Sequence, residues 1–542
     1  MLYELSNLKL PVGASPQPLE DAVAGQIRVT ADRIQRARIT REALDARKKP
    51  HLFRVVTVEF RVDPPLPEPL PKNVRVQPVS RLDITRPAPL PLREPAVPGA
   101  GRRPVVVVGS GPAGLFAALA LGEAGLPTIL LERGKPVETR MRDIGQLRSH
   151  GDLDPESNVC FGEGGAGTYT DGKLYTRVKH SYVRWVYRRL VDFGAPERIL
   201  VDAHPHLGTD KLVRLVKHLR LHLQERGVTV RFGALVSRLL VRDARVHGVR
   251  LADGEEIEAD RVVLAIGHSA RDTLANLLED GVKMEPKSFA VGVRAEHPQE
   301  LINLSQYGTA SPPEDIGAAA YRLTHQVPDA NLGRRGVYSF CMCPGGFIVP
   351  SPTEVAHMAI NGMSNANRSA PYANSGIVVQ VMPEDLARHG YAHHPLMGIR
   401  FQRDLEAAAF RSTDTAYGAP GMRIDDFVAR RARGRMAGTH FRPKAEPHDL
   451  WELLPNWIAE PLSQGLKRFD RLIKGYAGAE GNLLAVESRT SAPIRIPRNE
   501  VFEAEGMAGL YPVGEGAGYA GGIVSAAVDG LRAAEHIIET WS

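Results

Sequence analysis

Three closely spaced glycines have the types and spacing to hold a pyrophosphate. Gly109, Gly111 and Gly114 directly follow residues 105–108, a run of four valines typical of a buried parallel strand. The first glycine allows a tight turn, the second lets the backbone approach a pyrophosphate, and the third lets the next helix close on the strand. The first amides of that helix, which would begin at Pro112, attract phosphate. The segment therefore predicts a dinucleotide-binding unit.

An acidic residue stands where such a unit binds a ribose. A second apolar run, residues 128–131, ends in Glu132, which lies 23 residues after Gly109. A carboxylate at this spacing accepts hydrogen bonds from the ribose hydroxyls of adenosine. An acid here, rather than a basic residue, argues against a ribose 2′-phosphate. Strand, glycines, helix, strand and acid in register are far more specific than the glycines alone.

Three later segments favour a flavin over a nicotinamide nucleotide. Residues 158–175, NVCFGEGGAGTYTDGKLY, contain five glycines that permit close backbone approach to a flat ligand. An irregular surface loop is the alternative interpretation of this segment. Residues 260–267, DRVVLAIG, are expected to form a buried strand, and they resemble the strand that ends beside the cofactor in flavoproteins with two dinucleotide-binding motifs. The third segment is residues 510–513, a short strand that leads to Gly514 and Glu515.

A helix beginning at Ile523 would face the flavin ring. Its N-terminal amides would point at the N1/C2=O edge, which gains negative charge on reduction. The chain contains one complete dinucleotide-binding set, so we expect FAD as the cofactor and no dedicated NAD(P)H domain. The residues expected to contact FAD are Gly109, Gly111, Pro112, Ala113, Gly114, Glu132, Arg133, Gly165, Gly167, Thr168, Asp171, Lys173, Gly267, Gly514, Glu515, Gly521, Gly522 and Ile523.

Together these segments resemble a family of bacterial FAD-dependent dehydrogenases within the flavoproteins that carry two dinucleotide-binding motifs. The matching segments are FGEGGAGTYTDGKL (161–174), PHLGTDKL (205–212), SFCMCPGG (339–346), NGMSNANRSAPYANSG (361–376) and ESRTSAPIRIPR (487–498). The resemblance implies FAD binding, oxidoreductase activity and an adenine-side backbone contact at Val236. It also assigns the ribityl contact to Glu515, where most members carry Asp.

Five residues are candidates for chemistry on a substrate. Cys341 and Cys343 are separated by one residue. They could form a redox pair that relays electrons to or from flavin, or they could be two small buried cysteines. Arg294 could hold a carboxylate and His297 could act as acid or base, unless both are solvated residues at a strand end. Arg489 could reach flavin or substrate, or form a salt-bridged turn. No set of Cys, His and acidic residues has metal-ligand spacing, so no metal is expected.

These residues require an α/β fold. We expect a Rossmann-like FAD-binding domain with an inserted α+β substrate domain and a small N-terminal α+β module. A composition break separates the module from the rest, because 12 of the 41 prolines fall between Pro64 and Pro104. The expected parts are the module (1–63), a proline-rich linker (64–103), the FAD-binding domain (104–273 and 487–542) and the substrate domain (274–486).

The module carries most of the chain's surplus positive charge. We expect a strand over residues 2–10, a helix over 19–47 and a strand in FRVVTVEFRV, residues 53–62. Residues 33–49 hold seven Lys or Arg against two acids. This basic helix is interpreted as a solvated face or as a contact for RNA. A flavin-dependent RNA-modifying protein and a non-catalytic flavin redox sensor therefore stay open beside the main hypothesis, an oxidoreductase.

The bulk composition limits the class of protein. Hydrophobic residues make up 43% and charged residues 24% of 542, which is typical of a globular protein. No apolar run is long enough for a membrane span, and the N-terminus does not resemble a secretory signal. Three cysteines argue against a disulfide framework, so we expect a cytoplasmic protein. The expected partners are a small-molecule substrate and, as an open option, NAD(P)H as a transient reductant.

Overall fold

The N-terminal module is a four-stranded antiparallel sheet with one helix. The computed structural model describes residues 1–13, 17–78 and 103–541. The sheet has the order β2-β3-β1-β4, and its single helix is α1 (Leu19–Ile27). The strands are β1 (Leu2–Pro11), β2 (Ile34–Lys48), β3 (His51–Val62) and β4 (Val74–Val76). The period-two residues Val56, Val58 and Phe60 are buried and form the core of the module.

The helix expected over residues 19–47 is wrong beyond residue 27. Arg28 adopts a left-handed conformation with φ of 61° and closes α1. Residues 34–48 instead form β2, which pairs with β3 from Ile34 opposite Val62 to Lys48 opposite His51. Pairing with a neighbouring strand therefore outweighed the helical propensity of this segment. The basic surface is a strand edge and not a helix face.

The expected linker, residues 64–103, is in part structured. Residues 74–76 form the edge strand β4. It pairs with β1, where Val76 lies opposite Tyr3 and Val74 lies opposite Leu5. Residues 79–102 lie outside the described part of the chain.

A parallel sheet forms the centre of the FAD-binding domain. Its order is β23-β11-β5-β6-β7, and all four strand pairs are parallel. The strands are β5 (Val105–Val108), β6 (Thr128–Leu131), β7 (Thr229–Arg231), β11 (Arg261–Leu264) and β23 (Leu510–Pro512). The helices are α2 (Pro112–Glu123), α3 (Val137–His150), α4 (Ser181–Asp192), α5 (Thr209–Glu225), α6 (Arg271–Glu279) and α13 (Ile523–Glu539). A second layer contains β8 (Val236–Arg242), β9 (Arg245–Leu251) and β10 (Glu256–Glu258).

A seven-stranded sheet forms a domain inserted between β11 and β23; it corresponds to the expected substrate domain and keeps that name below. Its order is β14-β15-β18-β13-β21-β19-β20, and only the β19–β20 pair is parallel. The strands are β13 (Phe289–Pro298), β14 (Thr324–Asp329), β15 (Gly333–Cys343), β18 (Tyr372–Val381), β19 (Ala419–Arg423), β20 (Ala445–Pro447) and β21 (Asn482–Glu487). Its helices are α7 (Gln299–Tyr307), α8 (Pro383–Arg388), α9 (Met397–Arg411), α10 (Ile424–Ala429), α11 (Leu450–Leu453) and α12 (Asn456–Leu472). Two small sheets pair β12 (Glu285–Pro286) with β22 (Ile494–Arg495) and β16 (Phe347–Pro350) with β17 (Ile360–Met363).

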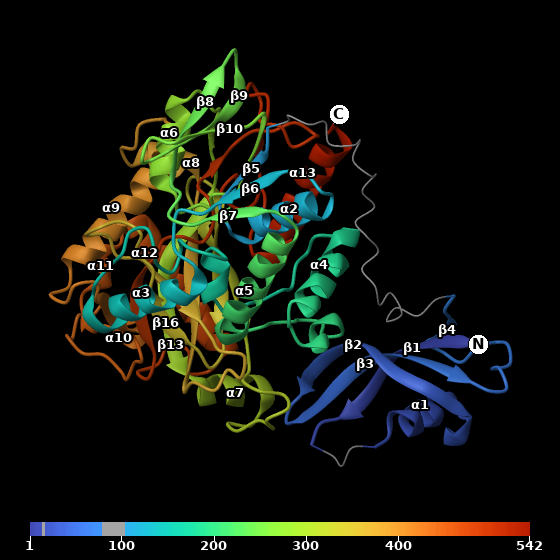
Figure 1. Cartoon of the computed structure of the whole chain (residues 1–542). Helices are drawn as coiled ribbons and strands as arrows, with labels where there is room; N and C mark the ends of the chain where they lie inside the picture. Colours follow the sequence, from blue (N-terminus) through green and yellow to red (C-terminus); the bar gives the residue numbers. More distant parts are fainter. Residues whose placement is uncertain (14–16, 79–102, 542) are drawn as a thin grey trace.

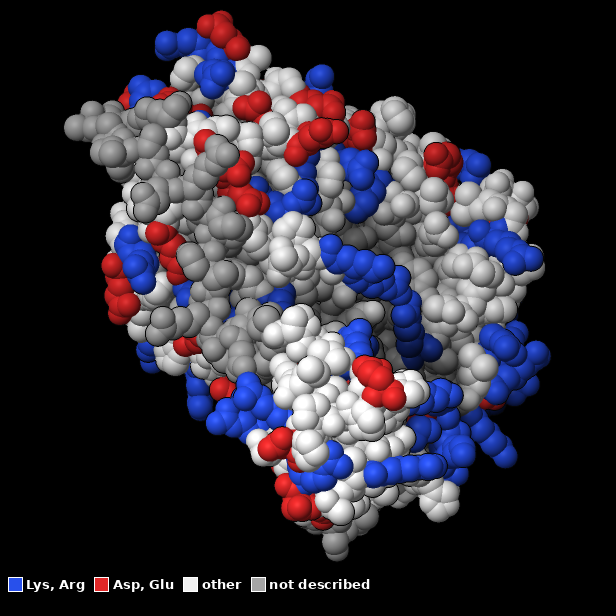
Figure 2. Space-filling model, turned by 90° about the vertical axis from the view of Figure 1, so that its right-hand side faces the viewer, with Lys and Arg blue, Asp and Glu red and all other residues white. Residues whose placement is uncertain are grey.

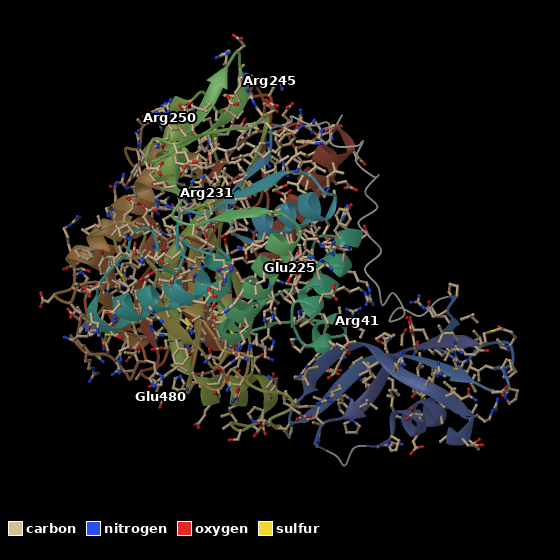
Figure 3. The ribbon with its side chains drawn as sticks, viewed as in Figure 1. Arg41, Glu225, Arg231, Arg245, Arg250 and Glu480 are labelled. Atoms are coloured by element: carbon tan, nitrogen blue, oxygen red, sulfur yellow. The ribbon has the colours of Figure 1, made fainter. Side chains whose placement is uncertain are left out.

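The module lies to one side of the two large domains, next to α4 and α7 (Figure 1). The backbone of Glu42 in β2 donates to the Val201 carbonyl and accepts from the Ala203 amide, both at 2.8 Å. Arg54 also pairs with Asp315. The labelled Arg41 lies at the edge of the module that faces α4 (Figure 3). The basic strand β2 is thus partly used as a contact within the chain.

No helix among residues 1–13, 17–78 and 103–541 is both long and apolar enough to cross a membrane.

Candidate functional site

One cavity joins the nucleotide-binding turn to the substrate domain. Its volume is about 420 Å³. The walls come from the β5–α2 turn, the glycine-rich residues 160–175, the end of β11, the bulge of β15 and the segment between β23 and α13. Segments from both large domains, far apart in the sequence, therefore share one binding space.

The β5–α2 turn is built for a phosphate. Gly111 is the N-cap of α2 and Pro112 is its first residue, so the first amides of the helix have no partner within the helix. A Cβ atom added at Gly111 would meet no protein atom within 4 Å, because the cavity lies directly in front of it. Gly114 does not line the cavity; a Cβ there would lie 1.9 Å from the Gly109 carbonyl oxygen. Gly114 therefore allows the helix to close, while Gly111 leaves room for the ligand.

Glu132 lines the cavity, but protein donors surround its carboxylate. One oxygen accepts from the Ser110 amide at 2.9 Å and the Ser110 hydroxyl at 2.7 Å. The other accepts from the amides of Gly134 at 2.9 Å and Gly162 at 3.0 Å. These four donors match the capacity of a carboxylate. The ribose contact of Glu132 therefore stays a prediction, because protein donors already occupy its carboxylate.

The opposite end of the cavity meets the N-terminus of α13. Added Cβ atoms at Gly267, Gly521 and Gly522 would each meet no protein atom within 4 Å, and all three residues line the cavity. Ile523, the first residue of α13, also lines it and lies next to Gly167. One helix N-terminus for a diphosphate and a second for a ring edge that gains negative charge fit FAD.

The other expected FAD contacts divide into two groups. Thr168 is buried and does not line the cavity; its hydroxyl lies 3.5 Å from the Glu163 carbonyl, so this prediction is corrected to a role in shaping the loop. The other expected contacts line the cavity: Gly109, Pro112, Ala113, Arg133, Gly165, Gly167, Asp171, Lys173, Val236, Gly514 and Glu515. Arg133 also lies over the Phe161 ring at 4.1 Å.

His268 is a cavity residue that sequence analysis missed. Its Nδ1 lies 3.4 Å from a Glu515 carboxylate oxygen, and both side chains line the cavity. It directly follows DRVVLAIG, so its place at the end of β11 was the available signal. Asn361 and Tyr175 line the cavity too, and both lie within segments that were singled out for other residues.

A buried acid organises the polar wall of the cavity. Asp171 is 1% exposed; its carboxylate lies 3.0 Å from the Lys173 ammonium and accepts bonds of 2.9 and 2.6 Å from Arg368. Burial favours the neutral acid, but the two cations outweigh burial and lower the pKa of Asp171 to about 2. Lys173 also donates to the Met342 carbonyl. The network thereby ties the glycine-rich loop to β15.

Of the two expected cysteines, only Cys341 reaches the cavity. It lies in a bulge of β15, where the pairing with β18 shifts between Phe340 and Cys343, and its φ is +44°. Cys343 is fully buried, and its thiol donates to the Cys341 carbonyl at 3.3 Å. Cys341 therefore forms part of the cavity wall, and Cys343 lies buried behind that wall.

Arg294 and His297 do not line the cavity. Arg294 is fully buried and binds Glu487 and Asn374, both at 2.7 Å, so it holds a carboxylate of its own chain rather than one of a substrate. His297 is also fully buried and bonds the Tyr476 carbonyl at 2.8 Å; burial lowers its pKa to about 4. The acid–base role expected for His297 does not fit this position.

Arg489 lines the cavity as part of a buried ion cluster. Its guanidinium binds Glu406 at 3.0 and 2.7 Å, and Arg271 binds the same carboxylate at 2.8 and 2.7 Å. Glu406 is fully buried, and although burial opposes it, the two guanidiniums lower its pKa. The salt-bridged interpretation of Arg489 matches the contacts. Arg271 and Glu406 carried no local signal in the sequence.

The comparisons with known proteins decide the family. An uncharacterized protein of Clostridium beijerinckii is 39% identical over 552 residues, which cover 100% of this chain and 99% of the relative. Family models match residues 104–143 as an FAD binding domain and residues 288–490 as an FAD-dependent protein, C-terminal domain-like. This chain belongs to a family of FAD-dependent oxidoreductases.

Other matches of this FAD-dependent oxidoreductase are partial. Residues 187–293 match a pyridine nucleotide-disulphide oxidoreductase model, and residues 2–61 match a domain of unknown function. Protein FixC of Escherichia coli is 29% identical over 201 residues, which cover 37% of this chain and 43% of FixC. The crystal structure of CtdE in complex with FAD has 11% identity and a TM-score of 0.29, covering 79% of this chain and 83% of that chain. A similarity this weak supports no comparison of sites.

Proposed function

We propose that this FAD-dependent oxidoreductase transfers a hydride or electrons between flavin N5 and a small organic substrate. The observation that carries the proposal is the cavity that runs from Gly111 to the wall formed by Lys173, Cys341 and Asn361. Bound FAD supplies the redox chemistry, and the chain supplies position and electrostatics. A substrate over the ring would lie against the substrate-domain residues of this wall.

The polar residues of this wall would orient the substrate. Lys173 keeps its charge, because Asp171 beside it raises its pKa although burial opposes this. It would attract an acidic or polar group, while Asn361 offers an amide donor and acceptor. At the other end, the N-terminus of α13 would stabilise the charge that develops at the flavin edge.

Neither alternative gains support from the site. The RNA-modifying alternative depended on a basic helix, and residues 34–48 form a strand instead. The redox-sensor alternative has no feature in its favour either. The electron donor is tested directly by anaerobic addition of NADH or NADPH, with dithionite as the positive control. We expect flavin absorbance to bleach with at least one donor and to return on addition of an electron acceptor; no turnover with any pair would favour a sensor.

The cofactor placement is tested by Gly111→Val. Gly111 has φ of −70° and ψ of 178°, which valine adopts readily, and its Cβ position is free of protein atoms. The variant should therefore fold but lack yellow colour, because the side chain occupies the space of the pyrophosphate. Visible absorbance measures bound FAD, and circular dichroism verifies the fold. Gly145→Val, in the exposed face of α3, is the matched control and should keep its FAD. Full FAD content in Gly111→Val would contradict the placement.

A further inference from the structure

We propose that Cys341 and Cys343 form a reversible disulfide that exchanges two electrons with the FAD of this chain. The proposal rests on the proposed function, because it requires FAD in the cavity. Both thiols come from β15 of the substrate domain, outside residues 187–293, which match the pyridine nucleotide-disulphide oxidoreductase model. The pair would act as a second redox centre beside the flavin.

The backbone brings Cys341 to the cavity at a cost. A non-glycine residue with φ of +44° is strained, and the bulge interrupts the β15–β18 ladder at this point. A cysteine that only fills a core has no need of this conformation. Strained residues persist where the surrounding structure holds them, and they concentrate at functional sites. In this chain the strain places a thiol on the wall of the flavin cavity.

Two cations surround the pair. The Arg294 guanidinium lies 3.3 Å from the Cys341 carbonyl oxygen and 4.0 Å from the Cys343 sulfur. Lys173 donates to the carbonyl of the residue between the two cysteines. The acids that face these groups, Glu487 and Asp171, are each paired to one of the two cations. An electropositive, partly accessible setting is the one in which thiols react.

The titration of the two thiols agrees with an asymmetric pair. Interaction with the Cys343 thiol, together with the charges of Lys173 and Arg294, lowers the pKa of Cys341 although burial opposes it. The same contact, with burial, raises the pKa of Cys343. Both shifts favour ionisation of the Cys341 thiol, at the cavity, over the Cys343 thiol behind it. This is the division expected of an attacking and a resolving thiol.

The electron balance closes with the flavin alone. In one direction the S–S bond breaks as FADH2 gives two electrons and two protons, which leaves oxidised FAD and two thiols. In the other direction the two thiols lose two electrons and two protons to FAD, and the S–S bond forms. A disulfide across one residue closes a small ring, and strained disulfides are the more easily reduced ones. Such a bond suits repeated opening.

An anaerobic dithionite titration tests the electron capacity of the diamide-oxidised holoenzyme. We expect four electrons per FAD in the wild type, two for the flavin and two for the disulfide. Cys341→Ser and Cys343→Ser should each take two. Cys160→Ser, which removes the remaining cysteine, should still take four. A wild-type capacity of two electrons would overturn the proposal.

A thiol count tests the same claim without any variant. The oxidised holoenzyme is denatured, alkylated and weighed by mass spectrometry, and the dithionite-reduced sample is treated alike. We expect one alkylated cysteine in the oxidised sample, Cys160, and three in the reduced one. Three alkylated cysteines in both samples would also overturn the proposal. Protein that takes up no FAD would refute the proposed function instead, so the two failures are distinguishable.

Discussion

At the scale of single residues, the buried carboxylate of Asp171 is the most consequential charge in the cavity wall. It forms ion pairs with both Lys173 and Arg368 and is almost fully buried. Its pKa falls from 3.8 to about 2 on folding, so the native state favours the ionised form. An acid with a lowered pKa stabilises the fold above its unfolded pKa, and this stability is lost as the pH falls through the folded value.

Asp171→Asn should therefore destabilise the protein at neutral pH by roughly 2 kcal/mol, because the two cations lose their partner. The difference from the wild type should shrink between about pH 4 and pH 2, where the wild-type carboxylate takes up its proton. Urea denaturation of both proteins at pH 7 and at pH 3 measures the loss of stability and its decrease at low pH. Asp210→Asn, at an exposed acid with one hydrogen bond to the Ala366 amide, is the control and should cost less. An equal cost at both pH values would contradict the assigned charge.

Residue-level prediction succeeded where chemistry is local. Gly109 and Gly111 lie in the β5–α2 turn and Glu132 follows the next strand, β6, so one strand–helix–strand unit brings all three to the cavity, and the sequence alone predicted them. His297 was misplaced because alternation along a strand does not tell which face meets a ligand. In β13 both faces are buried, and the side chain went into the core.

At the scale of elements, the packing of α2 against α13 holds both ends of the FAD site. An added Cβ at Gly530 of α13 would lie 2.1 Å from the Ala113 carbonyl oxygen of α2. The helices can be this close only because residue 530 has no side chain. Since the N-terminus of each helix lines the cavity, their spacing sets the distance between the two amide clusters.

Gly530→Ala should therefore push the helices apart, lower FAD affinity at least tenfold, which is about 1.4 kcal/mol, and reduce stability. Fluorescence titration of the apoprotein with FAD measures the affinity. Gly145→Ala in α3, whose Cβ position is open, should leave affinity unchanged and raise stability by about 0.5–1 kcal/mol. Unchanged affinity in Gly530→Ala would show that the helix spacing does not control the site.

Helices and strands were predictable where the hydrophobic periodicity and the neighbouring turn residues indicated the same element. The run of valines in β5 and the glycines after it fixed β5, α2 and β6 from sequence. Residues 34–48 carried no such agreement, because Arg, Glu, Ala and Leu favour a helix in isolation. Only the partner strand β3, which begins three residues later across a turn, decides the outcome.

At the scale of the whole molecule, Glu406 joins the two large domains. It lies on α9 of the substrate domain, whereas Arg271 lies on α6 of the FAD-binding domain and Arg489 on the segment that returns to it. Ser488 donates a further bond of 2.5 Å. These partners are far apart in sequence, which is why no motif could reveal them.

Glu406→Gln should lower the free energy of unfolding by about 3–5 kcal/mol, because buried Arg489 loses its counterion and Arg271 keeps only the partly exposed Glu354. Flavin should be released at a lower urea concentration than in the wild type, as measured by flavin fluorescence alongside far-UV circular dichroism. Glu354→Gln is the matched control, since Glu354 is 24% exposed in its side chain and pairs with Arg271 at the rim. That variant should lose no more than about 1 kcal/mol. Equal losses in both variants would argue against the joining role of Glu406.

The surface charge of the molecule is unevenly distributed. Lys and Arg side chains gather around a hollow on the face shown in Figure 2, on the side of the N-terminal module. Arg36, Arg38 and Arg41 of β2 are exposed. They lie on the strand whose backbone at Glu42 is hydrogen-bonded to Val201 and Ala203.

The split of the cofactor site between early and late segments has a consequence for biosynthesis. Residues 105–132 leave the ribosome hundreds of residues before β23 and α13, which complete the same cavity. At roughly 5–20 residues per second, translation leaves tens of seconds between the two. Residues 113–122 of α2 are all buried in the finished protein, so their apolar surface needs protection during that interval. The cavity itself is complete only after the start of α13 has emerged.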